Sequence, residues 1–346
     1  MERFAGPQRR ILSIDGGGLK GFFPAAYLAH LEELTGQRVL DHFDLMVGTS
    51  TGAIIVLALS LGMPAREILD LYRDCGEQVF ARSALAGEWG RRLRHILRPK
   101  YAAEPLMRVL GRSFGSRRLG EARCRLCIPS FNGSVDDVWV YKTAHHPKLR
   151  MDYRLPVVEV LRATTAAPTF FPAWRARSGA SLVDGGVWAN NPAMVGIVEA
   201  LGVLDWPIEQ LFMLSIGTTL HQAELSGVAA AGGILPWLWK QRLLHLPMGA
   251  HSRSISNMAG LLLKERYLRI NPTVPEGRYS LDNTGTAGDL EAYGEWQARR
   301  SLDQVQRLFL SAPVQPFQPL YPLEAGEAPS PGMEEQPFGP DSAPSE

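Results

Sequence analysis

The residues best suited to chemistry lie in two glycine-rich turns near the N-terminus. The first covers residues 15–21 (DGGGLKG) and the second covers residues 48–52 (GTSTG), and each follows an apolar, strand-like run. In the second turn, Ser50 has a glycine two residues away on either side, which is the spacing of a nucleophile elbow. Side chains larger than those of Gly48 and Gly52 would clash in so tight a turn, which pushes the serine oxygen into the open. Ser50 is therefore the predicted nucleophile.

The first turn can stabilise negative charge. Gly16, Gly17 and Gly18 present successive backbone N–H groups without side chains that would block an approaching oxygen atom. We predict that these groups form an oxyanion hole, which stabilises the tetrahedral intermediate of acyl transfer. The two turns together indicate an acyl hydrolase.

A serine nucleophile also needs a base, and Asp184 is the candidate. It follows a short strand-like run at 181–183 and precedes Gly185 and Gly186, which allow close approach of the backbone. An aspartate before a glycine is also a common turn residue, so its role as the base depends on Ser50 needing a partner.

The three motifs together resemble those of the patatin-like phospholipase family. The family pattern is a G-G-G-x-[RK]-G loop, a G-x-S-x-G elbow and a later D-G-[GA], and all three occur here in that order. Residues 163–172 (ATTAAPTFFP) match a further stretch that lines the site in the family. The resemblance runs from about Ile11 to Ile216. Lys20 stands where arginine is commoner in the family, which keeps the charge but loses the planar guanidinium fork.

The resemblance implies a three-layer α/β/α sandwich with a mainly parallel central sheet and a Ser50/Asp184 dyad. It gives Lys20 and the glycines that flank the dyad supporting roles. The implied activity is that of a phospholipase A-type enzyme, which releases fatty acids from membrane phospholipids through an acyl-enzyme. Compact bacterial members are similar in layout, and some of them are activated by a cyclic nucleotide and degrade the cell's own membrane in antiphage signalling.

Other functions remain open at this stage. Residues 16–21 also fit the dinucleotide-binding G-x-G-x-x-G, but the second strand runs into the serine turn and not to an acidic residue that would bind ribose. A serine esterase with a Ser-Asp-His triad is the second mechanism, with His145, His146 and His251 as candidate bases. A non-catalytic lipid- or nucleotide-binding module is disfavoured because both chemical residues are intact. No HExxH spacing occurs, so neither a catalytic metal nor a cofactor is expected.

Charge and cysteine content limit the partners and the compartment. Of 346 residues, 36 are Lys or Arg and 35 are Asp or Glu, so no nucleic-acid partner is expected. Basic clusters at 91–100 and 117–125 are interpreted as solvated faces, with a patch for lipid phosphate as the alternative. Cys75, Cys124 and Cys127 are an odd number of cysteines, which we interpret as reduced thiols of a cytoplasmic protein.

Hydrophobic periodicity predicts alternating strands and helices. Strands are expected at 10–14, 43–47, 125–132, 138–143, 181–183, 211–216 and 266–270, and helices at 21–36, 51–62, 63–80, 157–165 and 290–310. Asn191 and Pro192 suit the N-cap and the first position of one more helix. We predict one acyl hydrolase domain over 8–311 and a disordered, Pro-rich acidic tail over 312–346.

The chain must reach a lipid substrate without spanning a membrane. Its longest apolar run, residues 53–63, is well short of the roughly 20 residues that a spanning helix requires. We expect a cytoplasmic protein that contacts the membrane peripherally when active. Residues 232–248, which include Trp237 and Trp239, could either lie in a membrane interface or pack on the core. The lipid headgroup, the acyl position and the oligomeric state are left open.

Overall fold

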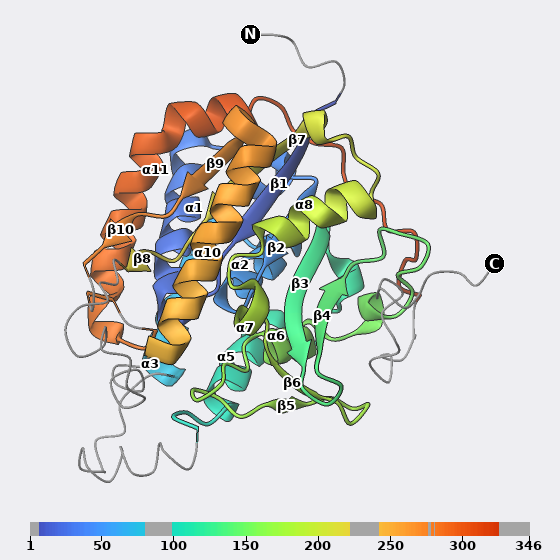
Figure 1. Ribbon diagram of the computed structural model, residues 1–346, viewed down its shortest axis with the longest axis vertical. Helices are drawn as coiled ribbons and strands as arrows, with labels where there is room; N and C mark the ends of the chain where they lie inside the picture. Colours follow the sequence, from blue (N-terminus) through green and yellow to red (C-terminus); the bar gives the residue numbers. More distant parts are fainter. Residues whose placement is uncertain (1–6, 80–98, 222–241, 276–277, 280, 325–346) are drawn as a thin grey trace.

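A mixed sheet forms the centre of the molecule. The computed structural model describes residues 7–79, 99–221, 242–275, 278–279 and 281–324. Within them, an eight-stranded sheet has the order β5-β6-β3-β2-β1-β7-β9, and β4 pairs with β3 off this path (Figure 1). Its strands are β1 (Arg9–Ile14), β2 (Leu45–Gly48), β3 (Arg125–Asn132), β4 (Asp137–Lys142), β5 (Trp174–Arg175), β6 (Ser181–Asp184), β7 (Leu211–Ile216) and β9 (Tyr267–Ile270). A separate ladder joins β8 (Leu220–His221) to β10 (Thr273–Val274).

The strand order reverses at β1, because β2 and β3 lie on one side of it and β7 and β9 lie on the other. This strand is parallel to β2 on one side and to β7 on the other. β3 continues the parallel sheet beyond β2, and β9 continues it beyond β7. At the far edge, β4 and β6 run antiparallel to β3. The mainly parallel sheet is thus confirmed, and the carboxyl ends of β1 and its neighbours lie where ligands bind in open α/β sheets.

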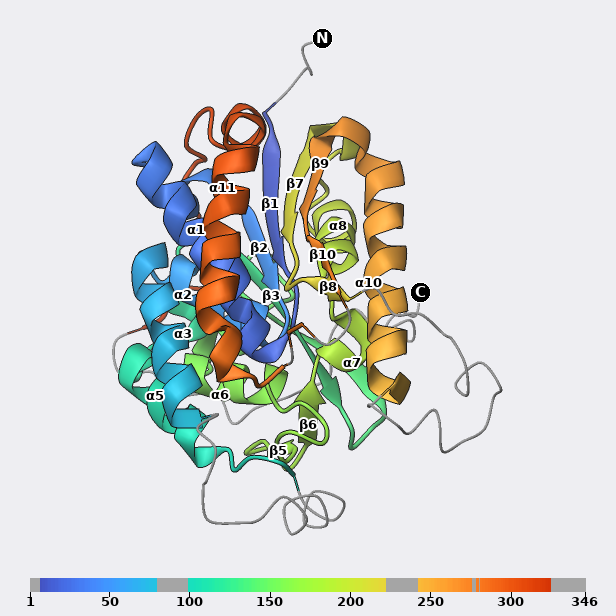
Figure 2. The same cartoon turned by 90° about the vertical axis from the view of Figure 1, so that its left-hand side faces the viewer.

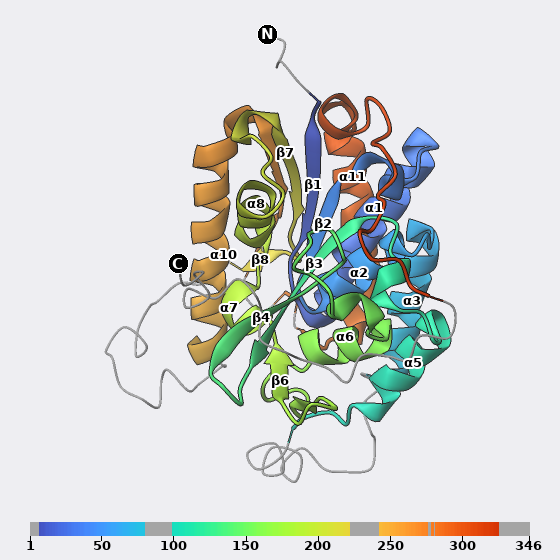
Figure 3. The same ribbon diagram turned by 90° about the vertical axis from the view of Figure 1, so that its right-hand side faces the viewer.

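Helices cover both faces of the sheet, as Figure 2 and Figure 3 show. One layer contains α1 (Phe22–Thr35), α2 (Thr51–Ser60), α3 (Ala65–Val79), α5 (Glu104–Phe114), α6 (Val157–Thr164) and α11 (Ala287–Phe309). The other contains α7 (Gly186–Ala189), α8 (Ala193–Gly202) and α10 (Arg242–Leu263). The predicted three-layer α/β/α sandwich is therefore confirmed. No helix in the described ranges has the length and apolar character needed to cross a bilayer.

Alternation along the strands divides the core between the two faces. In β1, Leu12 and Ile14 pack with the α1 layer, whereas Ile11 packs with residues of α8 and α10. This is the two-residue period of a strand that is buried on both sides. Every residue of α2 is buried, as expected for a helix that is apolar on all sides. The elbow before α2 is therefore anchored on the most enclosed helix of its layer.

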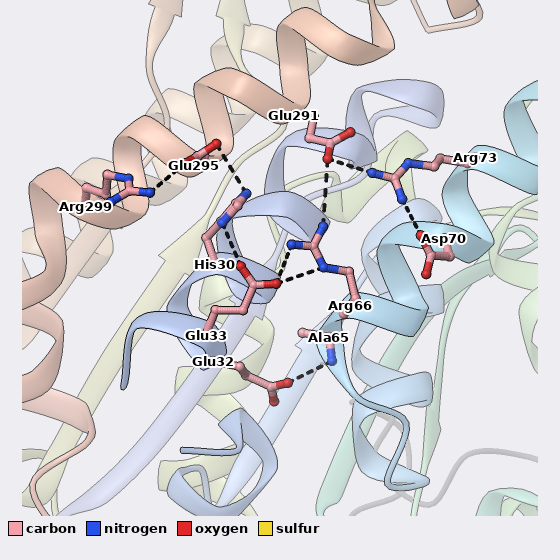
Figure 4. Close-up of polar contacts among 10 residues, drawn as sticks. All are labelled: His30, Glu32, Glu33, Ala65, Arg66, Asp70, Arg73, Glu291, Glu295 and Arg299. Carbon is pink, nitrogen blue, oxygen red and sulfur yellow. Dashed lines mark hydrogen bonds and ion pairs between the residues drawn. The ribbon is translucent and has the colours of Figure 1, made fainter. Parts of the chain in front are cut away.

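A surface network of ion pairs joins three helices of the α1 layer (Figure 4). Arg66 of α3 pairs with Glu33 of α1 and, at 3.9 Å, with Glu291 of α11. Glu291 also accepts from Arg73 at 2.7 Å. His30 lies between Glu33 and a second α11 carboxylate. Single exposed pairs contribute little, about 0–1 kcal/mol each, so the packing of these helices depends mainly on their buried apolar faces.

The domain does not end at residue 311, and the predicted boundary there is too early. The Ala312 carbonyl accepts hydrogen bonds from Arg10 and, at 3.2 Å, from His42 Nδ1. Further along, the Val314 N–H donates to the Asp41 carbonyl at 2.8 Å. Later contacts include Leu320 N–H to the Ala144 carbonyl, Tyr321 Oη to the Pro147 carbonyl, and Arg125 against the Phe317 ring. Residues 325–346 of the predicted tail lie outside the described residues.

The helix after the predicted Asn191 cap begins one residue later than expected. Its first helical residue is Ala193, and Pro192 precedes it. Asn191 still acts in the cap, because its Oδ1 accepts a hydrogen bond of 3.1 Å from the Ala193 N–H. The cap fixes the start of α8, which follows α7 (Gly186–Ala189) after Asp184.

Candidate active site

Ser50 lies in a sharp turn between β2 and α2. Its backbone has φ 54° and ψ −119°, a left-handed conformation that is rare for a residue with a side chain. A Cβ on Gly52 would lie 2.3 Å from the Ile14 carbonyl oxygen, and one on Gly48 would lie 2.5 Å from the Gly52 oxygen. Both glycines are therefore required by close backbone contacts, as the G-x-S-x-G spacing predicts.

The Ser50 hydroxyl donates a hydrogen bond directly to Asp184. The Ser50 Oγ to Asp184 Oδ2 distance is 2.6 Å. The other carboxylate oxygen, Oδ1, accepts from the Gly186 N–H at 2.7 Å. A Cβ on Gly185 would lie 2.3 Å from the Pro129 oxygen, so this glycine lets the turn approach β3. The structure thus brings the two predicted catalytic side chains into contact.

Thr164, at the end of α6, ties the elbow to the sheet. Its Oγ1 accepts from the Ser50 N–H at 3.0 Å and donates to the Pro129 carbonyl at 2.6 Å. β6 pairs with β3 so that Asp184 lies opposite Ser130. The Asp184 N–H also donates to the Ala166 carbonyl at 3.1 Å. The strained Ser50 backbone and the Asp184 backbone are therefore held by neighbouring residues of β3 and of the C-terminal end of α6 with the residues that follow it.

Burial changes the acid–base properties of Asp184. Only 5% of the residue is exposed. Burial raises the pKa of its carboxyl to about 6, although the hydrogen bonds from Ser50 and Gly186 oppose the rise. Asp184 therefore remains mostly ionised at neutral pH and takes up a proton more readily than a solvated aspartate does.

The glycine loop after β1 lies beside Ser50. A Cβ on Gly16 would lie 3.4 Å from the Ser50 Cβ. However, the Gly16 N–H donates to the Asn190 carbonyl at 2.9 Å, so the prediction that Gly16 supplies an oxyanion donor is wrong in this geometry. The N–H groups of Gly17 and Gly18 have no hydrogen-bond acceptor within the described part of the chain.

The conformation of the loop depends on its glycines. Gly18 has φ 56°, in the left-handed region. A Cβ on Gly17 would lie 2.2 Å from Thr218 Oγ1, which itself donates to the Gly16 carbonyl at 2.8 Å. Backbone N–H donors without an acceptor among the described residues, in a loop whose first glycine lies beside Ser50, are the kind of group that can hold an oxyanion.

Lys20, which was predicted to support this loop, is buried. Its Nζ lies 3.5 Å from the Thr219 carbonyl oxygen. Burial lowers the pKa of its ammonium group to about 8, and the nearby Asp15 carboxylate opposes this change. The described contacts of Lys20 do not include Ser50 or Asp184. The interaction of its charge with Asp15 places Lys20 beside the start of the glycine loop.

Comparison with known proteins identifies the family. The model of the family described as patatin-like phospholipase matches residues 12–197, which is more than half of the chain. The chain belongs to this family. It is therefore a hydrolase of the patatin-like phospholipase class, and the matched residues include Ser50 and Asp184.

Bacterial patatin-like phospholipases are similar over most of their length. The chain is 31% identical over 303 residues to a protein of Pseudomonas aeruginosa named cGAMP-activated phospholipase, covering 86% of this chain and 90% of that one. It is 30% identical to a protein of the same name from Vibrio cholerae, covering 90% and 96% respectively. Among solved structures, VipD from Legionella pneumophila aligns with a TM-score of 0.47 and 14% identity over 87% of this chain and 67% of that one.

In this patatin-like phospholipase, no histidine among the described residues is bonded to Ser50 or Asp184. His145 is buried, and its Nε2 bonds to Glu199 at 2.8 Å. In the sheet register, Lys142, shortly before His145 in the chain, lies opposite Cys127 near the start of β3. Asp184 lies opposite Ser130, nearer the other end of that strand. Both Asp184 oxygens are already engaged, by Ser50 and by Gly186. The direct Ser-to-Asp contact therefore favours the dyad over the triad alternative.

The other candidate bases have no described bond to the dyad. His146 Nδ1 accepts from the Lys148 N–H at 3.3 Å. His251, on α10, has a buried Nδ1 atom without a hydrogen-bond partner among the described residues. Burial lowers the pKa of His251, and Asp15 opposes this change. His251 thus lies near the glycine loop.

Cys127, His145 and Glu199 form the cluster in the described residues that most resembles a metal site. Their potential ligand atoms all lie within 4.8 Å of one another. However, the Lys142 ammonium lies 2.6 Å from Glu199 and already compensates its charge. Burial raises the pKa of the Cys127 thiol well above its ordinary value, so it stays protonated. The cluster is a buried ion-pair network, away from the dyad.

Some predicted features fall outside the described residues. They include Trp237 and Trp239 and most of the basic cluster at 91–100. In the second cluster, Arg117 pairs with Glu121. The Arg125 guanidinium lies 5.4 Å from the centroid of the Trp206 ring, and that of Arg9 lies 5.0 Å from the same ring. Arg117 and Arg125 thus contact residues of their own domain, which favours a structural role for them.

Sequence reasoning missed the residues that hold the turns in place. Thr164 lay within the recognised 163–172 stretch, but its bond to the Ser50 N–H depends on how α6 packs on the elbow. Asn190 and Thr218 bind Gly16 through a carbonyl and a hydroxyl respectively. No spacing in the sequence points to such contacts, because the partners are far apart along the chain.

Proposed function

We propose that the chain is a phospholipase A-type hydrolase in which Ser50 is the nucleophile and Asp184 is the base. The observation that carries the proposal is the 2.6 Å hydrogen bond from Ser50 Oγ to Asp184 Oδ2. A base in direct contact can take the hydroxyl proton as the oxygen attacks, without a histidine between them. Membrane phospholipids are the proposed substrates, which requires peripheral contact of the protein with the membrane.

In the first step, Ser50 Oγ attacks the fatty-acyl ester carbonyl while its proton passes to Asp184. The tetrahedral intermediate then collapses, and the proton goes from Asp184 to the oxygen of the departing lysophospholipid. An acyl-enzyme remains. In the second step, water attacks the acyl-enzyme and gives its proton to Asp184, which returns it to Ser50 as the fatty acid leaves. No group other than the dyad and water is needed to balance the protons.

The oxyanion of each step is proposed to bind the N–H groups of Gly17 and Gly18. Removal of one such donor typically costs about 3 kcal/mol of transition-state stabilisation. The positive charge of Lys20 supports the same oxyanion through the local field, and it does so most strongly below the pKa of about 8. The close backbone contacts of Gly48, Gly52 and Gly185, and the hydrogen bond from the Gly186 N–H to Asp184, maintain the turns that carry Ser50 and Asp184.

We further propose that a cyclic nucleotide activates the enzyme in antiphage defence. Support comes from the bacterial relatives named cGAMP-activated phospholipase, because the chain covers 90% and 96% of their lengths. The aligned region spans almost the whole of each relative, so no large segment of those proteins lacks a counterpart in this chain. The nucleotide acts as a regulator in this proposal and takes no part in the ester chemistry.

Two substrates separate these proposals. Wild type and the Ser50→Ala variant are assayed on a short soluble ester and on phospholipid vesicles, with and without cGAMP, and both are treated with a fluorophosphonate probe. We expect the probe to label Ser50 and the variant to lose both labelling and hydrolysis. Ser113→Ala, on the exposed face of α5, is the control serine.

Each proposal has its own contradicting result. Hydrolysis by folded Ser50→Ala would contradict the dyad. An unchanged vesicle rate with cGAMP, in an enzyme that cleaves the soluble ester, would contradict the activator and leave the dyad intact.

A further inference from the structure

We propose that Arg269 is a positioning residue that holds the oxyanion loop, residues 15–18, through Asp15. The inference rests on the proposed function, in which Gly17 and Gly18 stabilise the oxyanion. Arg269 lies on β9, far from Ser50 in the sequence, and its described contacts do not include the dyad. It therefore acts through another residue and not on the substrate.

The Arg269 guanidinium donates two hydrogen bonds to the Asp15 carboxylate. Nη1 donates to Oδ1 at 2.8 Å and Nη2 donates to Oδ2 at 2.5 Å. Asp15 is only 3% exposed, and the Arg269 side chain is 14% exposed. A paired fork of this kind fixes the orientation of a carboxylate as well as its position.

Two serines complete the cluster. Arg269 Nη1 also donates to Ser215 Oγ at 2.7 Å, and Nη2 donates to Ser252 Oγ at 3.3 Å. The Ser252 hydroxyl donates to Asp15 Oδ2 at 3.3 Å. Ser215 belongs to β7 and Ser252 to α10, so the cluster connects the end of β1 to β7, β9 and α10.

The sheet register explains why this arginine can reach the loop. Ser13 of β1 lies opposite Ser215 of β7, and Ser215 lies opposite Arg269 of β9. The Arg269 side chain thus crosses β7 to reach Asp15, the first residue after β1. The backbone at Asp15 is held as well, because its N–H donates to the Ile216 carbonyl at 3.0 Å.

The loop needs such a restraint because glycines have little conformational preference of their own. Asp15 directly precedes Gly16, whose N–H and carbonyl groups are both hydrogen-bonded. These contacts set the direction in which the next peptide units enter the left-handed turn at Gly18. Oxyanion donors are effective only when they are oriented before the reaction, and a displacement of about 1 Å can cost roughly 100-fold in rate.

A purely structural role is the competing explanation, since an unpaired buried charge is destabilising. The two explanations differ in the turnover of each correctly folded site. A structural pair changes the number of active molecules, whereas a positioning pair changes the rate constant of each one. Titration with a fluorophosphonate counts the active molecules. The kcat for p-nitrophenyl butyrate per titrated site measures the rate constant of each one.

The main variant is Arg269→Lys in the full chain, because it keeps the positive charge and loses the bidentate hydrogen bonding to Asp15. We expect kcat per titrated site to fall roughly 10- to 100-fold, less than the about 100- to 1,000-fold that outright loss of one oxyanion donor costs, because the donors are displaced and not removed. KM should change by less than about threefold, since the loop acts mainly in the transition state. Ser252→Ala removes one bond to Asp15 and leaves the ion pair, so we expect a smaller loss in the same direction.

Glu199→Gln is the matched control, because it breaks a comparably buried pair with Lys142 that is away from the dyad. Its melting temperature should fall while its kcat per site stays at the wild-type value. The double variant Asp15→Asn/Arg269→Gln removes both charges of the cluster. Relative to Asp15→Asn alone, it should regain stability while kcat remains low.

Two results would overturn the proposal. One is a wild-type kcat per site in Arg269→Lys, and the other is a double variant that regains kcat together with its stability. A wild-type enzyme that neither hydrolyses the ester nor reacts with the probe would instead overturn the dyad itself, and this inference with it.

Discussion

Replacing Asp184 by asparagine should slow hydrolysis at least ~100-fold and make the folded protein more stable at alkaline pH. Burial raises the pKa of Asp184 to about 6, against an ordinary value of 3.8. The difference, about 2 pH units, corresponds to about 3 kcal/mol between the charged and neutral forms. Asparagine has a similar shape and no charge, so it avoids the cost of keeping a carboxylate out of water.

The sign of the effect follows from proton binding. Because the folded state binds the Asp184 proton more tightly than the unfolded state does, this stabilisation is present below pH 3.8 and is lost as pH rises through about 6. The asparagine variant has no such loss. We expect the two proteins to be similarly stable near pH 4, and the variant to be more stable by up to about 3 kcal/mol at pH 8.

Urea denaturation at pH 4, 6 and 8, followed by tryptophan fluorescence, measures the difference. In the same samples, hydrolysis of a soluble ester by the variant should be at least ~100-fold slower than by wild type. Wild-type kcat/KM should fall below pH about 6, as Asp184 becomes protonated. Asp152→Asn is a useful control, because burial raises the pKa of Asp152 to about 7. It should share the stability effect and keep full activity.

Either of two results would refute this reasoning. A variant that is less stable than wild type at pH 8 would show that the ionised carboxylate is not penalised by burial. An acid limb of kcat/KM well below pH 5 would show that the base is better solvated than its 5% exposure indicates.

Three further changes test the surroundings of the dyad. Gly17→Ala places a methyl group where Thr218 Oγ1 would be 2.2 Å away, so kcat for a soluble ester should fall more than KM rises; an unchanged kcat in folded protein would place the oxyanion donors elsewhere. Thr164→Val leaves the Ser50 N–H without its acceptor, and the melting temperature and kcat should both fall, with a loss of about 1–3 kcal/mol of stability for an unsatisfied buried donor; wild-type unfolding curves would contradict this. A chain ending at Ser311 should melt at a lower temperature than one ending at Glu324, because it loses the contacts of Ala312 and Val314; equal melting temperatures would show that these contacts contribute nothing.

Much of the fold could be predicted from periodicity and from glycine spacing. β1, β2 and α2 follow alternating or continuous apolar runs that end at turn residues, and their burial matches these patterns. The contact between Ser50 and Asp184 could be expected from motif order, since each residue ends or follows a strand of one sheet. Local signals of this kind are strong where the backbone geometry permits few residue types.

What sequence reasoning could not predict depends on contacts between distant segments. The Gly16 N–H was expected to be free, and only the packing of the Asn190 carbonyl against it shows otherwise. The segment after residue 311 has few apolar residues, and its composition indicated disorder. A small number of anchoring contacts, such as that of Tyr321, hold it against the domain, and an average over composition does not detect them.

The three cysteines have a practical consequence for experiments on this protein. Cys75, Cys124 and Cys127 are all unpaired and buried, and burial raises the pKa of each thiol. Because the thiolate is the reactive form, maleimides and mild oxidants should modify the folded chain slowly. The three native cysteines should therefore react little during site-directed labelling of the folded protein. A single cysteine introduced at an exposed α10 position such as Asn257 could carry a fluorophore or spin label without first removing the natural ones.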